Sequence, residues 1–173
     1  ARPLRKAGAA RVISFETLYA APPQLMAHAP ALMIVGPLAG ACAAVLAPNS
    51  RWAWMISVAA SIFAGWMALC VAGEVARHGV VDYAMAGFRP PLGIAFRIDW
   101  LGAMMALLIS SVGVLAALYS GHALRSEVAG EKHGLFQAGF LLCQAGLLGL
   151  VSTGDAFNAF VFLEISSIGT YAL

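Results

Sequence analysis

Five long apolar runs, separated by short polar segments, form the hydrophobic pattern of this chain. A helix needs about 20 residues to cross the hydrocarbon core of a bilayer, and each run comes close to that length. The pattern predicts an all-α integral membrane protein of about five transmembrane helices, over residues 31–47, 52–73, 100–120, 135–152 and 155–173. The fifth run is still apolar at Leu173, so we expect the sequence to stop within this helix.

Residues 74–98 form the one sizeable polar segment between runs, after the second and before the third. Two short alternating stretches, VVDYAMAGF and GIAFRI, flank the turn signal RPPLG. Alternation next to proline and glycine is typical of paired strands. We expect a short β-hairpin-like loop with a structural role at one end of the bundle.

The first 29 residues differ from the rest, because they are basic and contain no long apolar run. A secretory signal is excluded, since no apolar core of 7–15 residues follows the basic start. Two interpretations stay open: a native basic tail, or upstream sequence before a start at Met26, in which case residues 1–25 are non-native. Residues 30–173 are expected to form the transmembrane bundle.

Composition supports the membrane assignment, with 61% hydrophobic and only 10% charged residues. The basic residues are scattered and form no aromatic-interleaved patch, so a nucleic-acid partner is not expected. Their distribution favours a cytoplasmic N-terminus if the tail is counted and no orientation if it is not.

Neither a metal nor an organic cofactor is expected. Cys42, Cys70 and Cys143 match no metal-ligand spacing, and we interpret them as small buried residues. The histidines occur singly in tails or loops, where solvated or interfacial positions are expected: His28, His78, His122 and His133. Phosphate-binding and nucleophile motifs are lacking, so the chain is not expected to be an enzyme.

Small residues recur along two of the predicted helices. Gly36, Gly40 and Ala44 are spaced by four on the first, and Gly139, Gly146 and Gly149 lie along the fourth. Such spacing is typical of close helix contacts in membranes, and we expect packing within the bundle.

Glu164 is the most informative residue, because it is an ionisable group in the middle of an apolar run. A charge at the centre of a membrane helix costs about 3 kcal/mol even on lenient scales, so such residues are usually functional. Helical periodicity predicts a shared face for Glu164 and a set of largely apolar neighbours: Phe157, Phe160, Val161, Ser167, Ile168 and Tyr171. We predict a proton or cation path at Glu164; the alternative is a neutral carboxyl that hydrogen-bonds a neighbouring helix.

Four further residues are candidates for a supporting role, namely Asp155, Asn158, Ser167 and Tyr171. Asp155 follows Thr153 and Gly154, where a helix N-cap belongs, and capping alone explains it. Asp99 before the third run has the same explanation.

Residues 154–173, GDAFNAFVFLEISSIGTYAL, resemble the D-type subunit of the Mrp-type multisubunit cation/proton antiporters, whose fifth helix follows a pattern close to GD-x-FN-x-FVF-x-EI. The segment GFRPPLGIAFRIDWLGAMMALLISSVGVLAALYS resembles the hairpin and third helix of that family. The resemblance covers roughly residues 26–173, the N-terminal third of such a subunit. The wider group includes antiporter-like subunits of respiratory complex I and membrane-bound hydrogenases.

The resemblance implies that Glu164 is the essential glutamate of the fifth helix, which works with a lysine on a later helix to move protons. That lysine is absent here, since Lys6 and Lys132 are the only lysines and neither lies in a predicted span. The family places both termini outside the cytoplasm.

The expected function is that of part of a proton-conducting subunit of a multisubunit Na⁺/H⁺ antiporter, multi-pass in the inner (plasma) membrane. The implied partners are other membrane subunits, the lipid bilayer, protons and monovalent cations. Two alternatives remain: a proton-pumping subunit of a complex I or hydrogenase type, or a short structural subunit whose small-residue faces pack on a larger complex.

Overall fold

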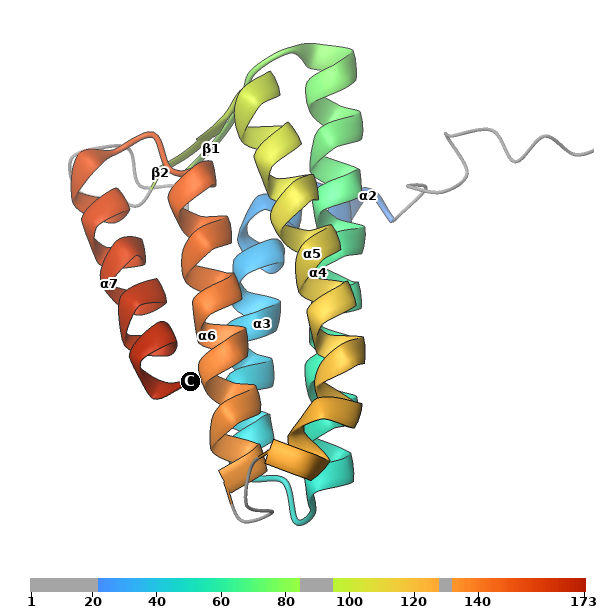
Figure 1. The fold of residues 1–173 in the computed structure, drawn as a ribbon. Helices are drawn as coiled ribbons and strands as arrows, with labels where there is room; N and C mark the ends of the chain where they lie inside the picture. Colours follow the sequence, from blue (N-terminus) through green and yellow to red (C-terminus); the bar gives the residue numbers. More distant parts are fainter. Residues whose placement is uncertain (1–21, 85–94, 128–131) are drawn as a thin grey trace, which may run out of the picture.

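The computed structural model describes residues 22–84, 95–127 and 132–173. Five long helices stand side by side, and two short strands lie at one end of them (Figure 1). The elements in chain order are α2 (Pro23–Ala27), α3 (Ala29–Val45), α4 (Ser50–His78), β1 (Val81–Ala84), β2 (Ala95–Ile98), α5 (Trp100–Glu127), α6 (His133–Ser152) and α7 (Ala156–Ala172).

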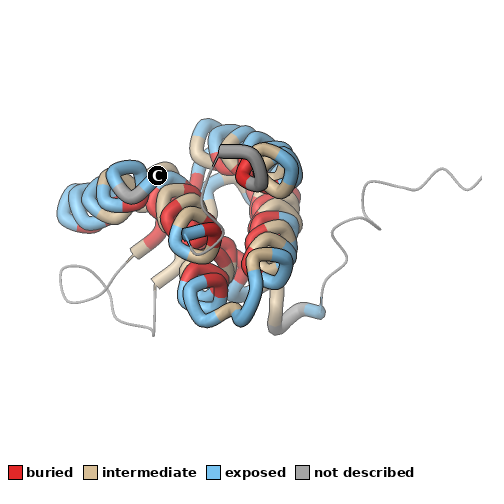
Figure 2. The backbone as a smooth tube through the Cα atoms, turned by 60° about the horizontal axis from the view of Figure 1, so that its bottom comes forward, coloured by how far each residue is buried: buried red, intermediate tan, exposed pale blue. Residues whose placement is uncertain are grey.

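Four of the long helices form one group, and the fifth is added to its side. Helix α3 packs on α4 and α6, α4 packs on α5, and α6 contacts all the other long helices. Helix α7 lies outside this group against α6, as the end-on view in Figure 2 shows. Buried residues gather where the helices face one another, while the outward sides are exposed.

Three helices are long and apolar enough to cross a membrane, namely α4, the stretch Trp100–Leu124 of α5, and α6. Helix α3 is a shorter apolar helix, and α7 has 17 residues, or about 26 Å at 1.5 Å per residue. Large apolar side chains cover the outward surface, as expected where lipid replaces water. The predicted fold class, an all-α membrane protein with a small strand pair, is confirmed.

The two strands form the predicted antiparallel pair, in which Val81 lies opposite Ile98 and Ala84 opposite Ala95. The turn sequence RPPLG lies outside the described residues. Phe96 and Ile98 point inward and are buried in the apolar core near this end of the bundle. The hairpin thus closes that end of the bundle, in agreement with its expected structural role.

Helix ends and the burial of two cysteines differ from the sequence analysis. Helix α4 continues to His78 rather than ending at residue 73, and Gly79 ends it with a positive φ of 83°. Helices α2 and α3 begin inside the expected tail, at residues 23 and 29. Cys42, expected to be buried, is exposed on the outward side of α3, and Cys143, also expected to be buried, is half-buried.

Glycines of α3 face the interior, as the packing interpretation predicts. A Cβ on Gly36 would lie 2.6 Å from the Phe63 ring, and one on Gly40 would lie 2.7 Å from the Ala60 side chain. Only a residue without a side chain allows α3 and α4 to approach this closely.

Candidate functional site

Helix α7 begins at a well-defined cap. The Asp155 carboxylate accepts a hydrogen bond from the Phe157 backbone N–H, with Oδ1 and N 3.3 Å apart. Just before it, the Gly154 N–H donates to the Ala95 carbonyl at 3.4 Å, which ties the α6–α7 link to strand β2. Asp155 therefore fixes where α7 starts, as the capping interpretation predicts. Asp99 caps α5 similarly, accepting from the Gly102 N–H at 2.8 Å.

Glycines bring α7 into close contact with α6. A Cβ on Gly146 would lie 2.6 Å from the Ser166 backbone nitrogen, and one on Gly169 would lie 2.7 Å from the Cys143 backbone nitrogen. The Phe162 ring covers Gly149 and also meets the Phe96 ring, with the centroids 6.1 Å apart. These contacts fix the rotation of α7 and hence the direction in which its other side points.

The opposite side of α7 is the face predicted from helical periodicity, and it is turned away from the bundle. Its large side chains are exposed, from Phe157 (71%) near the start to Tyr171 (92%) near the end. Glu164 is exposed in the middle of this face. We call this surface the outer face of α7; its members are Phe157, Phe160, Val161, Glu164, Ile168 and Tyr171.

The Glu164 carboxylate has no hydrogen-bond or ion-pair partner among the residues that the structure describes. Basic residues in the described ranges lie only at helix ends or in the hairpin: Arg51, Arg77, Arg97, Arg125 and Lys132. None of these positions is in the middle of a helix. None of the described basic residues pairs with Glu164.

The other candidates are divided between two sides of α7. Ser167 is half-buried and Tyr171 is exposed, so both lie toward the outer face, one and two turns beyond Glu164. Asn158 instead lies on the inner side, only 6% exposed, with its Nδ2 group unpaired within the described structure. The structure does not bring Asn158 together with Glu164.

Sequence reasoning missed a set of buried polar groups between α4, α5 and α6. His133, expected to be solvated or interfacial, is the first residue of α6 and only 6% exposed. Its Nδ1 contacts the Ser50 hydroxyl and its Nε2 contacts the Leu124 carbonyl at 3.0 Å. That expectation was wrong because α6 begins two residues earlier than predicted, which places the His133 ring between α4 and α5.

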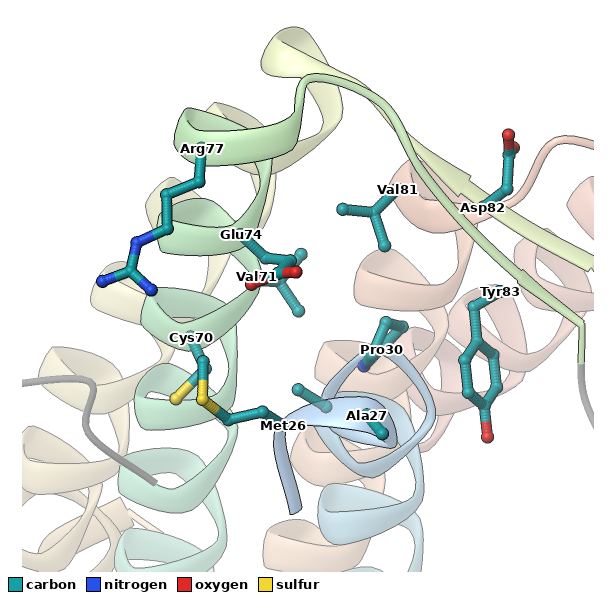
Figure 3. A pocket seen from close by; sticks show the side chains of 11 residues that line it. Met26, Ala27, Pro30, Cys70, Val71, Glu74, Arg77, Val81, Asp82 and Tyr83 are labelled. Carbon is teal, nitrogen blue, oxygen red and sulfur yellow. The ribbon is translucent and has the colours of Figure 1, made fainter. Parts of the chain in front are cut away.

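A cavity of about 410 Å³ lies near the hairpin end, between the start of α3, the end of α4 and strand β1 (Figure 3). Glu74 and Arg77 border it from α4, and Asp82 and Tyr83 from β1. Glu164 does not line this cavity. No cluster of three or more potential metal ligands occurs in the described ranges.

Comparisons with known proteins agree with the resemblance noted from the sequence. No family model matches the chain. The chain is 40% identical over 154 residues to NADH-quinone oxidoreductase subunit N of Desulforudis audaxviator, covering 86% of this chain and 30% of that protein. It is 33% identical over 107 residues to the D-type subunit of the Na⁺/H⁺ antiporter of Alkalihalophilus pseudofirmus, covering 62% of this chain and 21% of that protein.

A solved structure, the membrane-bound sulfane sulfur reductase, an archaeal respiratory membrane complex, matches with a TM-score of 0.73 and 29% identity. The match covers 83% of this chain and 29% of that one. This chain thus spans less than a third of the length of these relatives. The predicted resemblance to D-type antiporter subunits and to complex I antiporter-like subunits is confirmed, and the chain is a multi-pass membrane protein.

Proposed function

We propose, from the similarity of this chain to antiporter-like membrane subunits, that it contributes the carboxylate Glu164 to the proton path of such a subunit. One observation carries the proposal: Glu164 stands in the middle of the apolar outer face of α7 and has no partner in the described part of the chain. The α6–α7 glycine contacts hold it in that direction.

The outer face is better suited to protein than to lipid. A single charge facing the hydrocarbon core costs about 3 kcal/mol, whereas a carboxylate between helices can be paired. The matched segments make up 30% and 21% of the two relatives, so these proteins have further chain that can cover this face. We expect the outer face of α7 to be covered by helices of the complete subunit.

Proton transfer then follows from the pairing. A cation beside Glu164 favours the ionised carboxylate, and its withdrawal favours the protonated form, because burial alone disfavours charge. In the proposed mechanism Glu164 releases its proton when the cation is near and takes up another when the cation moves away. The Ser167 and Tyr171 hydroxyls, one and two turns along the helix, are proposed to relay the proton, whereas Asp155 positions the helix.

The similarity leaves two sources of energy for proton movement. In both cases the parent subunit would work in the inner (plasma) membrane together with other membrane subunits. The fifth-helix motif favours the exchange of protons for monovalent cations, and sodium is the cation we propose. The longer match to the NADH-quinone oxidoreductase subunit favours a redox-driven proton pump. The third alternative, a structural subunit held through the glycine faces, has less support, because Gly36 and Gly40 contact Phe63 and Ala60 within the chain.

The test compares two glutamates in the complete parent complex, reconstituted in vesicles. We expect Glu164→Gln to abolish proton movement. The control, Glu74→Gln, alters a half-exposed residue near the end of α4 whose carboxylate lies 3.6 Å from His78, and it should leave transport unchanged. Wild-type transport by Glu164→Gln, in complexes that assemble normally, would contradict the proposal.

The same vesicles separate the two driving forces. A sodium gradient applied without any electron donor moves protons if the parent is an antiporter. If proton movement instead requires an electron donor and acceptor, the parent is a redox-driven pump. In either case the role proposed for Glu164 is judged by the loss of transport in Glu164→Gln.

A further inference from the structure

Buried and half-buried polar side chains form a seam between α4, α5 and α6, on the side of α6 away from Glu164. On α4 the polar residues recur at helical spacing, and on α6 they do the same, so each set follows one side of its helix. We call this set the polar seam; its members are Ser50, Trp54, Ser57, Ser61, Ser120, His133, Gln137 and Gln144.

Helices α4 and α6 run in the same direction (Figure 1), and two side-chain pairs fix their register along the polar seam. Ser50 contacts His133 at one end, and Ser61 donates to Gln144 at 2.8 Å at the other; both pairs are 83 residues apart in sequence. Eleven residues of helix separate the two pairs, which is about 16 Å. The seam therefore reaches from the loop end of the bundle to about half the thickness of a bilayer core.

Protein groups alone do not satisfy the seam. Three of its buried side chains have an atom without a hydrogen-bond partner in the described structure: the Ser57 hydroxyl, Oε1 of Gln137 and Nε2 of Gln144. These side chains are 0%, 1% and 3% exposed. Orphaned polar atoms this deeply buried are usually satisfied by ordered water.

Space for water exists at the loop end of the seam. A cavity of about 20 Å³ is lined by Ser50, Trp54, Ser120, His133 and Gln137, among others. A single water needs at least about 10–15 Å³ and two to four polar partners, and both conditions are met here.

Above Gln144 and Ser61 the interior shared by α3 and α4 is apolar. The buried serines nearer the hairpin, Ser110 and Ser152, each donate to a backbone carbonyl of their own helix, and the buried Asn158 belongs to α7. The core toward the hairpin contains Met33, Met67, Val71 and Leu148, all at most 2% exposed, packed with Phe96 and Ile98 of the hairpin. An apolar core of this kind stays dry.

We propose that the polar seam binds internal water, which enters at the loop end of the bundle, reaches the level of Gln144 and stops at the apolar core. The water in the polar seam is separate from the proposed path at Glu164, because α7 packs on the other side of α6 through Gly146 and Gly169. The inference therefore does not rest on the function proposed for Glu164.

The experiment is radiolytic hydroxyl-radical labelling of the full-length protein in its complex, read residue by residue by mass spectrometry. Radicals formed from bound water label the side chains beside it. We expect His133 to be labelled although it is buried, and Met33 and Met67 to stay unlabelled although methionine is the more reactive side chain. Equal labelling of His133 and Met67, or no labelling of His133, would overturn the proposal.

Two variants show whether the label comes from water in the seam. Gln137→Leu removes an orphaned oxygen from the cavity wall, and labelling of His133 should be lost. Ser110→Ala is the matched control, because this serine is 1% exposed but its hydroxyl already donates to the Ala106 carbonyl at 2.7 Å. Unchanged labelling of His133 in Gln137→Leu would mean that bulk water reaches the ring, and would refute the seam as its source. If Gln137→Leu fails to assemble, the wild-type comparison of His133 with Met67 still decides.

Discussion

Replacing Gly146 by alanine tests whether the close α6–α7 contact holds α7 in place. The added Cβ would lie 2.6 Å from the Ser166 nitrogen and 2.8 Å from the Phe162 carbonyl oxygen. Both are backbone atoms, so no side chain can rotate away, and α7 has to shift.

The magnitude follows from two opposing effects. Overpacking costs about 1–3 kcal/mol, while alanine in place of glycine stabilises a helix by about 1 kcal/mol. Gly146→Ala should therefore lower the free energy of unfolding by about 0–2 kcal/mol. Gly65→Ala is the matched control, since its Cβ would meet the nearest atom, Cβ of Ser110, at an ordinary 3.7 Å. That variant should gain about 1 kcal/mol.

The assay is thermal unfolding of the purified variants in detergent micelles, followed by circular dichroism. The expected difference of about 1–3 kcal/mol corresponds to roughly 2–12 °C for a chain of this size, with Gly146→Ala unfolding first. If Gly146→Ala unfolds at or above the temperature of Gly65→Ala, the contact is not as tight as described and the direction of Glu164 is not fixed by it.

Three further predictions concern helix ends and the hairpin. Asp155→Ala should lower the free energy of unfolding by about 1 kcal/mol through loss of the α7 cap, whereas Asp155→Asn, which can still cap, should melt like wild type; transport lost in Asp155→Asn would show a role beyond capping. Gly79→Ala should lower the free energy of unfolding by about 1–3 kcal/mol, because alanine is strained at φ 83°. No atom lies within 4 Å of the new Cβ, so strain is the only expected effect, and an unchanged melting curve would count against that backbone geometry. Neutralising Arg97 and Asp82, whose side chains are 68% and 74% exposed and 3.9 Å apart, should change the melting temperature little; a large loss would mean that this pair organises the hairpin.

The face of α7 that carries Glu164 could be predicted from the sequence, because which residues share a face of a helix depends only on the sequence of that helix. The residues expected to share that face are exposed or half-buried in the structure, and the inner side carries Asn158, Phe162 and Gly169. The hairpin was also predictable, since alternation and turn residues are local signals. Periodicity could not show what Glu164 contacts on another helix, and no described residue pairs with its carboxylate.

The polar seam could not be predicted with the same ease, because its members come from three helices and packing decides which sides meet. A signal was nevertheless present in the sequence. Ser50 and Ser61 are eleven residues apart on one apolar helix, and His133 and Gln144 are eleven apart on another. Polar residues at equal helical intervals in two membrane helices indicate facing sides, but the register of α4 against α6 emerges only from the fold.

The proposed role of Glu164 requires its carboxyl to change protonation state during transport. Difference infrared spectroscopy of the reconstituted parent complex, with and without the driving ion gradient or electron donor, measures this directly. We expect a protonated-carboxyl band in the difference spectrum that disappears in Glu164→Gln and persists in Glu74→Gln. A band that remains unchanged in Glu164→Gln would show that Glu164 is not the carboxyl that takes up and releases the proton.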